Sequence, residues 1–178
     1  MRMDDRDAFE HGASEIIWEW AARKKRSSAE DSESPNAWFK REAYRFLREY
    51  VQSGKQKLLE SVVRSDQRPN KLVEEAIQNP FKLGLLAMCV DESITRSDRH
   101  VFGNQMLYAH LHDVPPEFLN GFIAVSGKPA VIAAKLKKDF IEPGLEERAA
   151  RMGRKVKDVP DGRRPKPGRG VSRARAQR

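Results

Sequence analysis

The sequence has a single cysteine, which excludes a framework of intramolecular disulfides. That residue, Cys89, lies in the apolar run LGLLAMCV and is expected to be a small buried side chain. No apolar run reaches the roughly 18 residues that a membrane-spanning helix needs. The first residues, MRMDDRDAFEHG, are polar and acidic, unlike a secretory signal peptide. These absences favour a cytoplasmic location, and association with the nucleoid is compatible with them.

The chain also lacks the common signatures of catalysis. Its Gly-Lys pair, in SGKPA, has no upstream glycine at the spacing of a phosphate-binding loop. No serine or cysteine nucleophile has a visible base. His110 and His112 are two residues apart, whereas ligands on one helix face are three or four apart. We therefore expect no enzyme, no cofactor and no metal site. The alternative is a catalytic site assembled from residues that are far apart in the sequence.

Neither histidine needs a special role in this interpretation. His110 is expected on a helix surface or half-buried. His112 is expected near the C-terminal end of its helix, where a positive charge is favoured.

Basic residues are concentrated at the C-terminal end of the chain. The 178 residues carry a net charge of +8. Residues 151–178 contain eleven lysines and arginines and two aspartates, so this segment carries +9 and the other 150 residues carry −1. The segment is rich in proline and glycine and has no aromatic residue, so it cannot bury enough surface to offset the entropy of ordering. It is predicted to be a disordered basic tail.

Apolar residues in the rest of the chain recur at helical spacings, and no alternating run is long enough for a sheet. The predicted fold is all-α, a compact bundle of about six to eight short helices with the disordered basic C-terminal tail. A helix over residues 81–94 is apolar on all sides and is expected at the centre of the bundle. Asn36 and Asp98 are the expected N-caps of two other helices.

The composition divides the chain into four segments. Residues 1–26 are predicted to form an N-terminal amphipathic helix, and residues 27–35 a flexible linker. A helical core domain over residues 36–150 and the tail over residues 151–178 follow. The linker allows the first helix to pack loosely or to reach toward a protein partner.

The segment FIAVSGKPAVIAAKLKKDF, residues 122–140, is similar to the core of a helix-turn-helix. The second helix of such a unit would pack through Val131, Ile132, Leu136 and Phe140. Its lysines would then meet the backbone of a duplex: Lys128, Lys135, Lys137 and Lys138. Because Asn, Gln and Arg are missing from its exposed positions, it would position the protein rather than read bases. An ordinary helical hairpin with a solvated lysine face is the alternative.

Two further sets of basic residues are candidates for nucleic-acid contact. Arg41, Tyr44, Arg45 and Arg48 share one helix face, where cations with an aromatic residue can bind phosphates and bases. Nearby glutamates make a solvated face with ordinary ion pairs the alternative. Cations of the tail can neutralise phosphates without choosing a sequence: Arg163, Arg164, Lys166, Arg169, Arg173, Arg175 and Arg178.

The tail also resembles the arginine-rich export signals of substrates of bacterial type IV secretion systems of the Vir type. Arg164 is followed, after a spacer, by Arg173, Arg175 and Arg178, about one residue out of that pattern at the spacer and at the last arginine. The resemblance implies a secretion (conjugation) substrate.

The leading hypothesis is a nucleic-acid-binding accessory or regulatory protein, bacterial or from a mobile element, with DNA favoured over RNA as partner. The alternatives are the secretion substrate and a helical adaptor that binds a protein through its first helix.

Overall fold

The computed structural model describes residues 4–26, 33–66, 68–88 and 93–157. Within these ranges the chain forms nine α-helices and one short 3₁₀ helix and contains no strand, which confirms the all-α prediction. The elements are α1 (Asp5–Lys25), α2 (Pro35–Gln52), α3 (Gln56–Ser65), α4 (Asn70–Ile77), α5 (Pro80–Met88), α6 (Arg96–Leu111), η1 (Pro116–Phe118), α7 (Leu119–Ser126), α8 (Pro129–Lys137) and α9 (Glu146–Lys157). Cys89, most of the predicted linker and residues 158–178 lie outside the described residues.

The N-caps of α2 and α6 differ from the two that the sequence predicted. Ser34 caps α2, because its Oγ accepts a hydrogen bond from a backbone N–H of the first turn at 3.3 Å. Thr95 caps α6 in the same way, at 3.0 Å. The predicted caps were therefore wrong: Asn36 instead accepts a hydrogen bond from the indole N–H of Trp20 at 3.2 Å. Asp98 lies three residues inside the cap and accepts from the Thr95 hydroxyl at 2.8 Å.

The central position predicted for the apolar helix is confirmed by α5. It contacts α1, α2, α3, α4 and α6, and most of its residues are buried. Its described part runs from Pro80 to Met88, and Ile94, the predicted end of the helix, is not helical. Asn79 fixes its start, with Oδ1 accepting the backbone N–H of Phe81 at 3.0 Å. At Gly103 of α6 an added Cβ would lie 3.2 Å from Cα of Lys82, so this glycine lets α5 and α6 approach closely.

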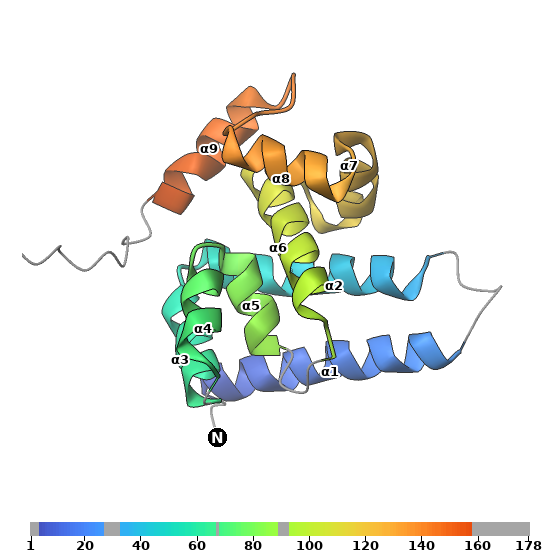
Figure 1. Cartoon of the computed structure of the whole chain (residues 1–178), viewed down its shortest axis with the longest axis vertical. Coiled ribbons are helices and arrows are strands. Elements are labelled where there is room, and N and C mark those ends of the chain that lie inside the picture. Colours follow the sequence, from blue (N-terminus) through green and yellow to red (C-terminus); the bar gives the residue numbers. More distant parts are fainter. Residues whose placement is uncertain (1–3, 27–32, 67, 89–92, 158–178) are drawn as a thin grey trace, which may run out of the picture.

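The first helix packs tightly rather than loosely. Figure 1 shows α1 beside α2 along one side of the molecule, and α1 also contacts α3 and α5. Phe9 and Trp20 are buried, and the ring of Trp20 stacks on Phe39 with centroids 4.3 Å apart. The loose packing expected from the linker is therefore wrong, since an aromatic contact holds α1 against α2.

The helix α6 joins the two ends of the molecule. It runs from the side formed by α1 and α2 to α7, α8 and α9, all three of which contact it (Figure 1). Residues 151–157, predicted as the start of the tail, lie in α9, and the side chains of Ala149 and Met152 in this helix are buried. None of the described helices has both the length and the apolar character needed to cross a bilayer.

Candidate functional site

The arginines at the start of the predicted basic face of α2 pair with carboxylates of the same region. Arg41 Nη1 lies 2.5 Å from Glu33 Oε2, and its Nε lies 3.0 Å from Glu42 Oε1. Arg45 pairs with the second oxygen of Glu42. These ion pairs match the alternative interpretation of this face, in which the charges are balanced locally.

The rest of the predicted α2 face is part of the packed interior. Tyr44 is fully buried and donates a hydrogen bond to the carbonyl oxygen of Val114 at 2.9 Å. Burial raises the pKa of the Tyr44 hydroxyl. Arg48 donates to the same oxygen at 3.0 Å, and its Nη2 lies 2.5 Å from Asp113 Oδ1. Tyr44 is therefore not on an exposed face, as both interpretations of this stretch required, since the helix turns it toward the loop after α6.

Lys135, one of the four predicted DNA-facing lysines, is half-buried and is held by groups of the protein itself. Its ammonium group lies 2.5 Å from Glu142 Oε1 and donates to the carbonyl oxygen of Ser126 at 2.9 Å. The Tyr108 hydroxyl donates to the same Glu142 oxygen at 2.9 Å. Lys135 thus ties α8 to α7 and to the loop after α8, so it is a structural residue.

His112 completes this polar cluster, which we name the Glu142 network: Tyr108, His112, Ser126, Lys135 and Glu142. His112 is fully buried. Its Nε2 accepts the backbone N–H of Glu142 at 2.9 Å, so its Nδ1 carries the proton and donates to the carbonyl oxygen of Tyr108 at 2.7 Å. Burial acts to raise the pKa of Glu142, but hydrogen bonds from Lys135 and Tyr108 and the Lys135 charge lower it overall.

The other histidine of the pair is also internal. His110 is 1% exposed, and its ring lies 5.2 Å from the ring of Phe81. The surface or half-buried position predicted for it is wrong, because α6 is enclosed by α5 on this side.

The packing predicted for the second helix of the helix-turn-helix is half right. Ile132 is buried and Leu136 packs against the core, as predicted. Val131 and Phe140, also predicted to pack inward, are 45% and 43% exposed. The helix ends at Lys137, so Phe140 lies beyond it, in the loop.

The remaining lysines of α8 do not form one row. Lys128 is exposed at the N-cap, whereas Lys137 and Lys138 are exposed at the other end. Nine residues of α-helix separate the two ends by about 13 Å. A nearby phosphate would therefore contact one end of α8 or the other.

The end that carries Lys137 lies near cations from two other helices. Burial lowers the pKa of His100, and the positive charges of Lys82, Lys137 and Arg96 lower it further. These four residues come from α5, α6 and α8, and we name them the cationic face. Among the described residues, neither Lys82 nor Lys137 has a carboxylate at ion-pairing distance, whereas Arg96 Nη2 lies 2.6 Å from Glu75 Oε2. The cationic face therefore holds positive charge that the described carboxylates balance only in part.

A hollow of about 870 Å³ lies beside the cationic face, between α4 and the first half of α6. Three apolar side chains line it: Leu72 and Val101, which are half-buried, and Ala76, which is buried. Its polar lining comes from α4 and its C-cap, from α5 and from α6: Glu75, Gln78, Lys82, Arg96, Ser97, Arg99 and His100. Burial lowers the pKa of Lys82, and the charge of Glu75 acts in the opposite direction. The lining thus holds three apolar side chains, Leu72, Ala76 and Val101, which we call the apolar floor. It also holds three cations, Lys82, Arg96 and His100, which we call the cationic rim, and the buried Arg99.

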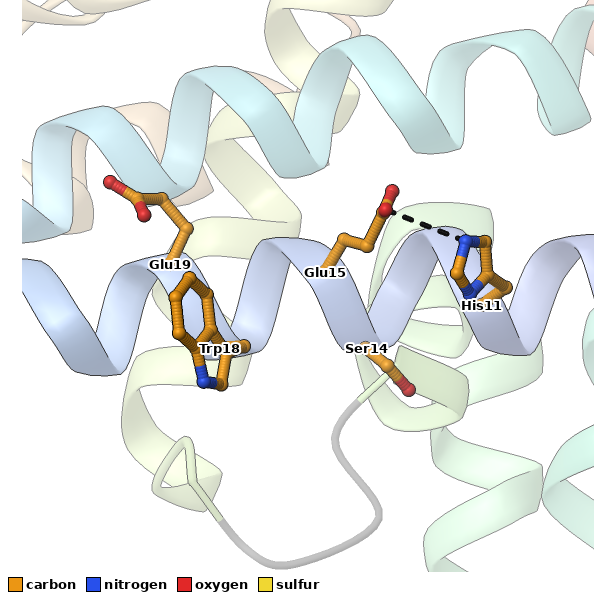
Figure 2. Close-up of a pocket in the computed structure, with 5 residues that line it drawn as sticks. All are labelled: His11, Ser14, Glu15, Trp18 and Glu19. Atoms are coloured by element: carbon orange, nitrogen blue, oxygen red, sulfur yellow. Dashed lines mark ion pairs between the residues drawn. The ribbon is translucent and has the colours of Figure 1, made fainter.

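A shallower hollow of about 480 Å³ lies on the outer side of α1. Figure 2 shows its lining, which comes from α1 alone: His11, Ser14, Glu15, Trp18 and Glu19. Trp18 is 72% exposed, and His11 Nε2 lies 3.4 Å from Glu15 Oε1. A large exposed ring on an otherwise polar helix face is suited to contact with another protein.

Sequence reasoning identified one member of the cationic face, Lys137, and missed Lys82, Arg96 and His100. The charge pattern of α5 and α6 gives no signal for them, since Lys82 is a single cation in an apolar helix. The close approach of α5 and α6 at Gly103 is what brings them together. The predicted cations of the tail lie outside the described residues.

In the described part of the chain, no three His, Cys, Asp or Glu side chains gather as a metal site. No protein-family model matches the sequence, and no curated protein or solved structure is significantly similar to it.

Proposed function

We propose that this chain is a nucleic-acid-binding accessory or regulatory protein that contacts phosphates through its cationic face. The supporting observation is that Lys82, Arg96 and His100 line one hollow, and that the charge of Lys137 at the end of α8 also acts on His100. Like charges held together repel one another, and the lowered pKa of His100 reflects that repulsion in part. A phosphate group placed among them would relieve the repulsion and release counterions.

The basic tail adds a second, tethered set of cations in this proposal. Its seven candidate residues would neutralise phosphates next to those held by the cationic face. DNA is favoured over RNA as the partner, and the cations would position the protein rather than read a sequence.

The test is a fluorescence-anisotropy titration of a labelled oligonucleotide with the full chain over a series of salt concentrations. The double variant Lys82→Glu, Lys137→Glu should weaken binding at least about tenfold and reduce the salt slope by about two, since each phosphate contact contributes about 0.9. Thermal melting establishes that each variant is folded under the conditions of the titration.

The matched control is the double variant Lys25→Glu, Lys57→Glu. It makes the same change of charge at two exposed lysines, one on α1 and one on α3. Its binding should change by less than about threefold. Equal losses in the two double variants would show that only net charge matters and would contradict a dedicated face.

A second candidate function, the helical adaptor, is favoured by one observation, the 72% exposure of Trp18 on α1. A photo-crosslinking residue in place of Trp18 should then give a discrete adduct with a single protein in cells. The same residue in place of Ser61, an exposed position on α3, should not. Identical adducts at both positions, or none, would contradict the adaptor function.

The secretion alternative depends on the tail alone. Fusion of residues 160–178 to a reporter should lead to its transfer by a type IV system if the resemblance is functional. Absence of transfer would exclude this alternative.

A further inference from the structure

We propose that the hollow beside the cationic face binds a nucleoside phosphate, with the base on the apolar floor and the phosphate on the cationic rim. This inference rests on the proposed function and deepens it. The nucleic acid held at this place would be single-stranded, because a base inside a duplex is stacked on both faces and cannot enter a hollow.

The size of the hollow fits such a ligand. Its volume of about 870 Å³ lies within the range of roughly 300–1,000 Å³ that is usual for small-molecule sites. Sites of this kind combine a mostly apolar lining with a few polar groups that fix the orientation of the ligand. Here the methyl groups of Leu72, Ala76 and Val101 supply the apolar part. A flat base would cover them and remove their surface from water.

The rim is suited to a phosphate. Lys82 offers an ammonium group that is half-buried and without a carboxylate partner among the described residues. Arg96 is held at the rim by Glu75 through one nitrogen, Nη2, which leaves the other guanidinium N–H groups for a ligand. Glu75 is the carboxylate in the lining, and its pairing with Arg96 reduces its repulsion of a phosphate.

The orientation of His100 is set by a chain of amides. The side-chain oxygen of Asn79 accepts the backbone N–H of Phe81 at 3.0 Å, so its Nδ2 is the donor to Asn104 Oδ1 at 3.4 Å. Asn104 Nδ2 then faces His100 Nε2 at 3.1 Å and donates to it. In neutral His100 the proton is therefore on Nδ1. That N–H can donate a hydrogen bond to a phosphate oxygen or to an acceptor atom of a base.

The experiment uses the full chain and four probes: a single-stranded oligonucleotide, the duplex of the same sequence, adenosine monophosphate and inorganic phosphate. The single strand should bind about tenfold more tightly than the duplex at equal salt, since it adds contacts with one unstacked base. The mononucleotide should compete with the single strand at millimolar concentration, and inorganic phosphate should compete less well because it lacks the base.

The variant Ser97→Trp places a bulky ring at an exposed position of the lining without removing a cation. It should abolish most of the preference for the single strand, so that the single strand and the duplex bind with similar affinity. The matched control is Ser61→Trp, at an exposed serine of α3, which should change neither. A Lys82→Gln variant, which keeps a long polar side chain, should weaken binding of the mononucleotide and of the single strand alike.

The outcomes separate this inference from the proposed function. Equal affinity for single strand and duplex, unchanged by Ser97→Trp, would overturn the nucleoside-phosphate site while leaving the cationic face as a phosphate-binding surface. Tight binding of the mononucleotide with no binding of either oligonucleotide would support the site, identify a free nucleotide as its ligand and contradict the proposed function. No binding of any probe would overturn both.

Discussion

The arginines of α2 and the lysines of the cationic face differ in whether a carboxylate lies beside them. Arg41, Arg45 and Arg48 each lie against a carboxylate, and Arg48 is only 14% exposed. Lys82 and Lys137 have no such partner among the described residues. The sequence pattern favoured α2, where the cations recur at helical spacing. The comparison teaches that the position of the carboxylates, more than the density of cations, decides which basic residues remain available for a ligand.

The largest expected effect concerns the stability of the α2 set. Arg48→Ala removes an ion pair with Asp113 and a hydrogen bond to Val114 and leaves both acceptors partly unsatisfied. We expect the free energy of unfolding to fall by about 2–4 kcal/mol, as is usual for breaking a largely buried pair. Urea denaturation measures it. Nucleic-acid affinity of the folded variant should be unchanged, and a loss of affinity without a loss of stability would reverse the assignment of Arg48.

The second prediction concerns the Glu142 network, in which Glu142 holds Lys135, one of the four lysines predicted to face DNA. Glu142→Gln should lower the free energy of unfolding by about 1–3 kcal/mol near pH 7, since the charged hydrogen bond from Lys135 is lost. The folded-state pKa of Glu142 lies below its ordinary value, so its contribution is present above that value and is lost as pH falls through the folded-state pKa. The difference from the unmodified chain should therefore shrink as the pH falls well below 4.5, the ordinary pKa of the group. A difference that does not change with pH would contradict this role.

The third prediction concerns His100 of the cationic face and the pH dependence of binding. The pKa of His100 lies below its ordinary value of 6.5, so the ring is mostly neutral near pH 7. A bound phosphate favours the charged ring, so binding takes up a proton and affinity rises as pH falls. We expect a rise of about threefold between about pH 7 and about pH 5. His100→Gln should flatten that profile, and an equal rise in the variant would exclude His100 as its source.

The smallest effect is expected at Arg45. Its pair with Glu42 is 45% exposed on the arginine side, and exposed pairs of this kind contribute little. Arg45→Ala should change the free energy of unfolding by less than about 0.5 kcal/mol and leave nucleic-acid affinity unchanged. A loss of affinity of tenfold would show that α2 does form part of the interface.

The helical pattern predicted most of the fold, because apolar stripes at helical spacing depend only on local sequence. Phe39, Ala43 and Leu47 of α2 are buried as the pattern requires, and α5 is central. The caps were less predictable. Asn36 and Ser34 are both suitable caps by residue type, and the contact between Asn36 and the indole of Trp20 is a tertiary one that spacing does not reveal.

The candidate site was predictable only in part, since polar residues change role with their neighbours. Lys135 and Lys137 lie two residues apart on α8, yet the first is held by Glu142 and the second lies by the cationic face. That difference depends on how the loop after α8 returns to α6. His100 and Lys82 are 18 positions apart in the chain and meet through the packing of α5 on α6.

The most direct test of the cationic face is a map of backbone amide chemical shifts in the full, isotopically labelled chain during titration with a single-stranded oligonucleotide. If the cationic face binds nucleic acid, the largest changes among the described residues will cluster around Lys82, Arg96 to His100, and Lys137, with little change around Arg41 and Arg45. Changes confined to α2, or to residues 158–178 with none at the cationic face, would contradict it.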